Sequence, residues 1–260
     1  MHGGDLVANY PYDESRSGAP VSEYSASPDD DTFKELALTY ATKHADMASR
    51  SRPGCHTTSS DQSSTYNFGR QGGVTNGAAW YSLKGGMQDF NYLATNAFEI
   101  TLELGCEKYP SAYSLPLEWQ RNAEAMISYM WKAHIGVKGT VSSDTGYITN
   151  AVISVVNITG GTPRPIQHDV TTGEYGDFYR LLTPGRYEVS ANHPAYFRLS
   201  QVVIVPPRQT SAVVVNFTWR EATLFYTMYR HVSQPRIYKR SLYQKVTESL
   251  LEHRDSRTKQ

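Results

Sequence analysis

The stretch Asn76–Cys106 reads NGAAWYSLKGGMQDFNYLATNAFEITLELGC and decides the fold of the first half of this 260-residue chain. Apolar and polar side chains alternate over residues 97–104, which predicts a half-buried β-strand. The alternation places Glu103 one residue before the end of that strand. Upstream, Tyr81 precedes the pair Gly85-Gly86, and this glycine hinge would let the phenol swing over a bound ligand.

Glu103 and Tyr81 each have two interpretations. A carboxylate at the carboxyl end of a strand can act as a general base, because ligands bind at that edge of open α/β sheets. The alternative is an ordinary solvated glutamate, and for Tyr81 it is a half-buried aromatic beside Trp80. Glu99 shares the face of Glu103 but lies about 13 Å away along the strand. Paired glycosidase carboxylates are at most about 9.5 Å apart, so this strand alone excludes glycoside hydrolysis.

Helical periodicity predicts two amphipathic helices, at residues 31–47 and at about 114–134. Residues 49–75 are rich in Ser, Thr, Gly and Arg without periodicity, which predicts a long loop. The apolar stripe of the first helix consists of Phe33, Leu36, Ala37, Tyr40, Ala41 and His44, and that of the second consists of Trp119, Ala123, Met126, Ile127, Met130 and Trp131.

The pattern changes at Gly136, where short β-branched runs separated by turn signals begin. Runs of this length and spacing predict a small β-sandwich over residues 136–219. The predicted fold class is therefore a mixed α/β part at 1–135 followed by an all-β sandwich, with a basic, poorly ordered tail at 220–260. The β-branched runs are 137–141, 151–158, 179–182, 187–191, 202–205 and 213–217.

Composition excludes several classes of function. The formal net charge is zero, which does not indicate nucleic-acid binding. No apolar run approaches the roughly 20 residues needed to cross a bilayer, so no transmembrane segment is expected. Met1 is followed directly by His-Gly-Gly-Asp, without the basic and apolar regions of a signal peptide.

Other features are typical of secreted proteins. Asn157-Ile158-Thr159 and Asn216-Phe217-Thr218 are N-glycosylation sequons. Cys55 and Cys106 have a spacing that matches no zinc motif, which leaves a disulfide or two free thiols. The compartment of the protein decides between these two states.

Three segments carry a family resemblance. They are HGGDLVANYPYD at 2–13, NGAAWYSLKGGMQDFNYL at 76–93 and FEITLELGCEKYP at 98–110. In this order they resemble the zinc metallocarboxypeptidases, and specifically the regulatory group of carboxypeptidases D, E, N and M. The segment GDFYRLLTPGRYEVSA at 176–191 is similar to the transthyretin-like domain that follows the catalytic domain in this group. The resemblance covers roughly residues 1–219.

The resemblance implies a role for five side chains. His2 matches the third zinc ligand, and Glu103 matches the general base that activates the zinc-bound water. Tyr81 matches the mobile tyrosine that closes over the substrate. Asp13 matches the acidic floor of the pocket for the C-terminal side chain, and Gln88 lies in the same pocket. An aspartate there favours Arg or Lys through charge-assisted hydrogen bonds.

A function follows from the resemblance. It implies a zinc-dependent carboxypeptidase that removes C-terminal Arg or Lys from peptide or protein substrates. The compartment it implies is the secretory pathway or the extracellular space. In such a compartment, a disulfide between Cys55 and Cys106 is favoured.

The chain also departs from the family pattern. The first two zinc ligands of the family come from a His-x-x-Glu motif, which the sequence does not contain, so the zinc site is expected to be incomplete. The first part therefore resembles the C-terminal portion of a catalytic domain, N-terminally truncated, and the chain is expected to be inactive alone. The alternative function is a non-catalytic binding or folding module whose autonomous unit is the β-sandwich.

Overall fold

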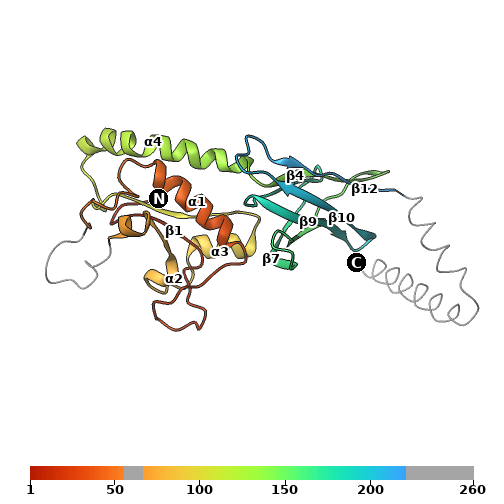
Figure 1. Ribbon diagram of the computed structural model, residues 1–260, viewed down its shortest axis with the longest axis horizontal. Coiled ribbons are helices and arrows are strands. Elements are labelled where there is room, and N and C mark those ends of the chain that lie inside the picture. The colour runs from red at the N-terminus through yellow and green to blue at the C-terminus, as the bar shows by residue number, and fades with distance from the viewer. Residues whose placement is uncertain (56–66, 221–260) are drawn as a thin grey trace, which may run out of the picture. The chain divides into compact units, whose positions relative to one another are not determined.

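The computed structural model describes residues 1–55 and 67–220 (Figure 1). Residues Met1–Val141 and Tyr147–Phe217 form one compact unit, and the described residues Ser142–Gly146 and 218–220 belong to a second unit. In the described ranges, no helix is both long and apolar enough to span a membrane.

The first half is built on a three-stranded mixed sheet with β1 in the centre. The order is β2-β1-β3. β2 runs parallel to β1, with Ala8 opposite Val74, and β3 runs antiparallel to it, with Val7 opposite Glu103. The strands are β1 (Leu6–Tyr10), β2 (Val74–Asn76) and β3 (Thr101–Leu104).

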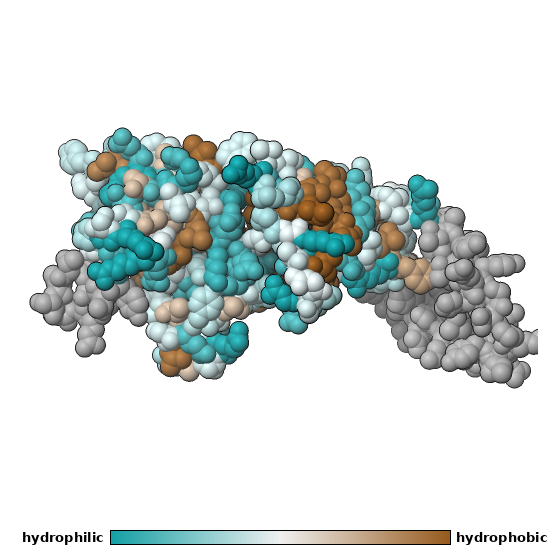
Figure 2. Space-filling model, viewed as in Figure 1, coloured by the Kyte–Doolittle hydropathy of each residue, from teal (hydrophilic) through white to brown (hydrophobic). Residues whose placement is uncertain are grey.

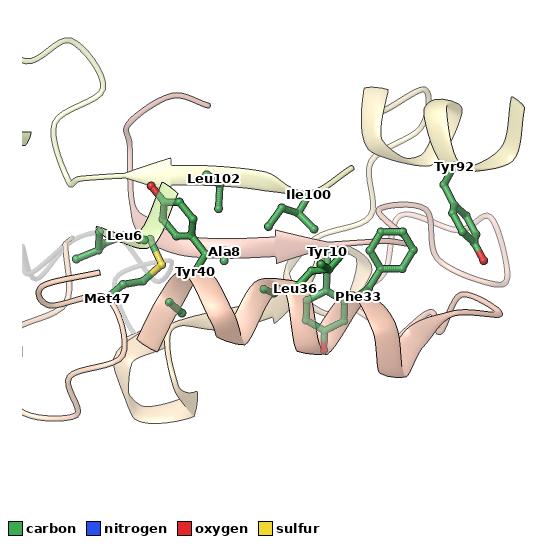
Figure 3. Packing of buried hydrophobic residues seen from close by; sticks show 13 residues of the cluster. Leu6, Ala8, Tyr10, Phe33, Leu36, Tyr40, Met47, Tyr92, Ile100 and Leu102 are labelled. Atoms are coloured by element: carbon green, nitrogen blue, oxygen red, sulfur yellow. The ribbon is translucent and has the colours of Figure 1, made fainter. Parts of the chain in front are cut away.

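Helices cover this sheet. Figure 3 shows Phe33, Leu36 and Tyr40 of α1 pointing toward β1 and β3. All three side chains are buried in one core with Leu6 and Leu102, which confirms the apolar stripe predicted for the first helix. The helices are α1 (Asp30–Lys43), α2 (Gly77–Trp80), α3 (Met87–Ala94) and α4 (Leu115–Trp131), with 3₁₀ turns η2 (Phe68–Gln71), η3 (Ala112–Ser114) and η4 (Lys132–His134).

The sequence placed some boundaries wrongly. Helix α1 ends at Lys43 because the Nδ1 atom of His44 accepts hydrogen bonds from the backbone amides of Asp46 and Met47, which draws the chain out of the helix. Strand β3 begins at Thr101 and not at residue 97, because β1 offers partners only to residues 101–104. The expected loop at 49–75 contains η2 and the start of β2, and part of it lies outside the described residues.

The buried face of α4 differs from its most apolar face. Trp119 and Trp131 of the predicted stripe are more than half exposed. The buried residues are Asn122 and Ala125. Tyr40 of α1 accounts for the burial of Asn122, because its hydroxyl donates a hydrogen bond of 2.6 Å to the Oδ1 atom of Asn122. Helix α4 therefore packs against α1 through Asn122 and Ala125, and Met126 of the predicted stripe and Tyr129 are partly buried against the same core.

The second half contains two sheets, which confirms the predicted all-β sandwich. One sheet has the order β10-β9-β6-β7, and the other has β4 between β11 and β12, with β5 and β8 also pairing with β4. The strands are β4 (Val137–Ser143), β5 (Gly146–Tyr147), β6 (Val152–Asn157), β7 (Arg164–Thr171), β8 (Asp177–Arg180), β9 (Gly185–His193), β10 (Tyr196–Val205), β11 (Val213–Val214) and β12 (Phe217–Trp219).

The predicted runs overlap observed strands, but the short strand β5 and the longer strand β7 were not predicted. Strand β7 was missed because only Val170 of its side chains is buried, so it lacks an apolar pattern. The run at 213–217 is divided between β11 and β12. The predicted tail at 220–260 lies outside the described residues apart from its first residue. The boundaries 1–135 and 136–219 remain predictions.

One edge of the sandwich presents apolar side chains. Strand β10 is the terminal strand of its sheet, and its Val202 and Ile204 are 55% and 69% exposed. Figure 2 shows apolar side chains gathered on the sandwich where Figure 1 draws β9 and β10. Exposed apolar side chains on an edge strand are typical of a surface that pairs with another chain.

A buried ion pair connects the helical half with the sandwich. Arg180 of β8 contacts Asp29, just before α1, at 2.9 Å, and both side chains are at most 1% exposed. The hydroxyl of Tyr92 on α3 donates a 2.7 Å hydrogen bond to the same carboxylate. His168 of β7 stacks on the ring of Tyr92 with the centroids 3.9 Å apart, and its backbone carbonyl accepts a hydrogen bond from Arg180. The guanidinium also lies over the ring of Phe98.

We predict that Arg180→Met lowers the free energy of unfolding by about 3–5 kcal/mol, because it leaves the carboxylate of Asp29 buried without a cation. Urea denaturation of the full chain measures this change. Combining it with Asp29→Asn should recover part of the loss, since the orphaned charge is then absent. Arg198→Met is the control, because Arg198 pairs with Glu188 while 51% exposed. Equal effects of the two single substitutions would contradict the prediction.

Candidate functional site

The carboxylate of Asp13 is the centre of a buried polar cluster. Asp13 is 6% exposed. Its Oδ1 atom accepts hydrogen bonds from the amide of Asn9 at 3.1 Å and from the amide of Gln88 at 2.8 Å. Asn9 stands near the end of β1 and Gln88 in the first turn of α3, so the central strand and the helix together position the carboxylate.

A second carboxylate fixes the backbone of this loop. Asp89 accepts hydrogen bonds from the backbone amides of Asp13 and Glu14 at 2.9 and 3.1 Å. Burial raises the pKa of Asp13 from 3.8 to about 6, and the negative charge of Asp89 adds to the increase, while the hydrogen bonds from Asn9 and Gln88 oppose it. The ionised form of Asp13 is therefore electrostatically unfavourable in the folded protein.

Glycines bring two backbone segments close to the Asp13 carboxylate. A Cβ atom on Gly77 would lie 1.9 Å from Oδ1, and one on Gly86 would lie 2.7 Å from Oδ2. Distances below 3.0 Å are not tolerated by real Cβ atoms, so neither position accepts a side chain without displacing Asp13. Glycine is therefore required at both positions by close approach.

Two features of the cluster lack partners within the described part of the chain. The carboxylate of Asp13 forms no ion pair with any of these residues. Gln88 is only 1% exposed, and its buried Oε1 atom accepts no hydrogen bond from the described residues. A buried carboxylate beside an unsatisfied acceptor suits a group that carries positive charge and several N–H donors.

His2 and Glu103 are brought together by strand pairing. The backbone amide of Leu104 donates to the carbonyl of His2, and the amide of His2 donates to the carbonyl of Leu102. The Nδ1 atom of His2 lies 3.9 Å from the Oε2 atom of Glu103. Burial raises the pKa of Glu103, and the nearby His2 opposes this increase. The strand pairing thus places the exposed imidazole of His2 beside the buried carboxylate of Glu103.

Tyr81 lies within electrostatic range of both carboxylates. It follows α2 directly, is 50% exposed, and its ring packs edge to face against Trp80 at 5.0 Å. Burial raises the pKa of the Tyr81 phenol, with further contributions from the charges of Glu103 and Asp13. The half-exposed ring beside Trp80 agrees with Tyr81 as an ordinary half-buried aromatic residue. The two carboxylates near its hydroxyl agree with Tyr81 as a tyrosine that closes over a bound ligand.

The described residues do not form a complete metal site. They contain no group of three His, Cys, Asp or Glu side chains that could hold a metal ion. A catalytic zinc needs three protein ligands, and His2 together with Glu103 supplies at most two candidate donors. The residues described in 1–55 and 67–220 therefore do not fit zinc by themselves, and no chemical step through zinc is derived from them.

The two cysteines are joined. Cys55 and Cys106 form a disulfide across 51 residues of sequence, so the prediction of a bond between them is confirmed in the structure. A loop of this length is strongly restricted in the unfolded chain when it is closed by a disulfide. The bond anchors the segment that follows β3 to the segment that precedes η2.

Both halves of the chain match known protein families. The zinc carboxypeptidase family matches residues 1–125, and the carboxypeptidase regulatory-like domain matches residues 136–220. Residues 1–125 of the chain belong to the zinc carboxypeptidase family. The predicted fold class, part of a carboxypeptidase domain followed by a transthyretin-like sandwich, is therefore confirmed.

Curated carboxypeptidases are similar to this chain over most of its length. Carboxypeptidase E of Caenorhabditis elegans is 49% identical over 221 residues, which cover 84% of this chain and 45% of that protein. Carboxypeptidase Z of Gallus gallus is 44% identical over 85% of this chain and 32% of its own length. Carboxypeptidase D of Mus musculus is 44% identical over 84% of this chain and 14% of its own length. The chain thus spans less than half of each of these relatives.

Sequence reasoning missed two residues of the cluster around Asp13. Asn9 and Asp89 both contact Asp13 or its backbone, and neither belongs to a recognisable spacing motif. A usable signal existed for Asp89, because it follows Gln88 directly in the first turn of a helix that starts at Gly86. Asn9 accepts a hydrogen bond from Gln88, which lies 79 positions later, and no local sequence pattern connects the two residues.

We predict that Gly77→Ala lowers the free energy of unfolding by about 1–3 kcal/mol, because the new methyl group overlaps the Asp13 carboxylate. Chemical denaturation measures the change. Gly160→Ala is the matched control, since its Cβ would meet no atom within 4 Å, and its effect should stay within about 0.5 kcal/mol. A tolerated Gly77→Ala would mean that Asp13 is not held as described.

Proposed function

We propose that residues 1–125 belong to a carboxypeptidase that releases Arg or Lys from the C-terminus of peptides and proteins. The observation that carries this proposal is the buried Asp13 carboxylate, which has no cation within the described residues and lies beside the unsatisfied Oε1 atom of Gln88. A guanidinium offers five N–H donors, enough to satisfy both groups at once. Lysine would satisfy the same carboxylate as a point charge.

The remaining site residues take roles around this pocket. Glu103 is proposed as the general base, because its raised pKa brings proton uptake and release closer to neutral pH. Tyr81 is proposed to contact the bound peptide from its half-exposed position next to both carboxylates. His2 is proposed as one ligand of a catalytic zinc, whose remaining ligands would come from outside the described residues.

The proposed compartment is the secretory pathway or the extracellular space. The Cys55–Cys106 disulfide supports it, because disulfides persist in oxidising compartments. Glycosylation of Asn157 and Asn216 is the corresponding modification.

We predict that Asp13→Asn abolishes the preference for a peptide ending in Arg over the same peptide ending in Ala, because the charge-assisted hydrogen bonds are lost. Isothermal titration with the two peptides measures this preference. The same substitution should raise the free energy of unfolding at pH 7 by on the order of 3 kcal/mol, the equivalent of a pKa shift from 3.8 to about 6. Unchanged preference would contradict the assignment of Asp13.

The pH dependence follows from the same raised pKa. The folded chain holds the Asp13 proton more tightly than the unfolded chain, so this group stabilises the fold most below about pH 4. Its contribution is lost as the pH rises through about 6. Binding of an Arg side chain needs the ionised form and should therefore weaken as the pH falls below about 6. Asp13→Asn should remove both trends.

Assayed alone with added zinc, the chain is predicted not to release C-terminal Arg from a short peptide, because the described residues do not supply three metal ligands. Amino-acid release detected by mass spectrometry measures this. Turnover that a chelator abolishes and zinc restores would contradict the prediction. Peptide binding without turnover would leave the Asp13 pocket as proposed.

The second candidate function is a non-catalytic binding module centred on the sandwich. The exposed Val202 and Ile204 on the edge strand β10 favour it. The buried Arg180 counts against a sandwich that folds alone, because its carboxylate partner, Asp29, lies outside residues 136–219. A cooperative unfolding transition of residues 136–219 expressed separately would support the module, and its absence would exclude autonomous folding.

A further inference from the structure

A cavity of about 250 Å³ lies between the N-terminus of α1 and one end of the sandwich. This volume is below the roughly 300–1,000 Å³ of sites for drug-sized ligands, so it suits a smaller group. Its polar lining is mixed in chemistry and contains carboxylate, hydroxyl, amide and guanidinium groups. The carboxylates belong to Asp29, Asp30 and Asp31, the hydroxyls to Ser27, Thr32, Thr183 and Tyr187, the amide to Asn157 and the guanidinium to Arg164.

The side chain of Asn157 is directed to the inner face of its sheet. Asn157 is the last residue of β6, and alternate residues of a strand share one face. Ile153 and Val155, which share its face, are at most 1% exposed. Asn157 is paired with Arg164 on one side and with Tyr187 on the other, so neighbouring strands flank it. Its amide therefore opens into the cavity that it lines.

Only one of the two polar atoms in the side-chain amide of Asn157 forms a hydrogen bond with the described residues. Its Oδ1 atom accepts a 2.9 Å hydrogen bond from the backbone amide of Thr159. Its Nδ2 atom donates no hydrogen bond to any residue in 1–55 or 67–220. The nitrogen that would carry a sugar in the sequon Asn157-Ile158-Thr159 is thus free of competing contacts.

Ser27 supplies an independent sign that the cavity takes a polar ligand. It is 5% exposed, and its hydroxyl has no hydrogen-bond partner among the described residues. An unsatisfied buried hydroxyl is unfavourable by about 1–3 kcal/mol unless a ligand or water pairs with it. Arg164 on the opposite wall forms no ion pair within the same residues. Together with the carboxylates of the lining, these groups offer both hydrogen-bond donors and acceptors, which suits the hydroxyl-rich surface of a sugar.

We propose that this cavity holds the first sugar of an N-linked glycan on Asn157, which connects the sandwich to the N-terminus of α1. In the modification, the Nδ2 atom forms a bond to the anomeric carbon of a lipid-linked oligosaccharide diphosphate donor. The bond from that carbon to the diphosphate breaks, the diphosphate leaves, and an amide proton passes to the transferring enzyme. The proposal rests on the secretory compartment proposed above.

The second sequon is a matched control on the same sandwich. Asn216 is exposed, and its Oδ1 atom accepts hydrogen bonds from the backbone and hydroxyl of Thr140. It does not line the cavity. A glycan on Asn216 would project into solvent, whereas a glycan on Asn157 has to pass through the cavity.

The test uses the full chain secreted from eukaryotic cells behind a cleavable leader. Glycopeptide mass spectrometry measures occupancy at each sequon, and a glycan-releasing amidase is applied to the folded protein. Release at Asn157 should be about tenfold slower than at Asn216, equivalent to about 1.4 kcal/mol of opening free energy. Denaturation should make the two rates equal.

Substitutions in the cavity wall show whether slow release of the glycan from Asn157 is caused by this cavity or by general crowding around the sequon. Arg164→Ala should raise the release rate at Asn157 toward that at Asn216 and leave Asn216 unchanged. Arg198→Ala, at an exposed arginine that does not line the cavity, should leave both rates unchanged. Ser27→Ala should act as Arg164→Ala does.

Three results would overturn the proposal. Occupancy of Asn216 with Asn157 unmodified would show that the cavity does not admit a sugar. Equal release rates on the folded protein would show that the sugar lies outside the cavity. Absence of glycan from both sequons would overturn this proposal and leave the proposed compartment untouched, because the added leader imposes secretion in this experiment.

Discussion

The contact between Asp29 and Arg180 is the constraint on which the rest of the fold depends. Two fully buried charges are tolerated only when they are paired and hydrogen-bonded, and here Tyr92 and the carbonyl of His168 add hydrogen bonds to the pair, while the Nε atom of Arg180 has no partner among the described residues. Asp29 precedes α1, Tyr92 belongs to α3, and Arg180 and His168 belong to the sandwich. One ion pair therefore fixes three parts of the chain in a single compact unit.

The same helix that carries Tyr92 also carries the contacts to Asp13. Gln88 donates to its carboxylate, and Asp89 accepts from its backbone. The position of Asp13 is thus coupled through α3 to the buried ion pair. A carboxylate held with a raised pKa and no cation among the described residues is unfavourable for folding. This unfavourable placement is the physical basis of the binding role proposed for Asp13.

The two halves differ in how far the sequence predicted them. In the sandwich, β-branched runs mark strands buried on one face, and most of the observed strands were found; β7, largely exposed, gave no such pattern. In the helical half, α1 was predicted from its stripe. The buried face of α4 was not, because Asn122 is selected by a hydrogen bond from Tyr40, which is distant in sequence.

The sequence by itself determined the family and the order of the two folds, because these depend on local motifs and short periods. The family resemblance in turn implied Asp13, Gln88, Tyr81 and Glu103 as the residues to consider. Only the tertiary structure decided what those residues contact. The unsatisfied Gln88 oxygen, the glycines around Asp13 and the Asp29–Arg180 pair join residues tens to more than a hundred positions apart. Burial and partner choice arise from packing of the whole chain, and no local pattern encodes them.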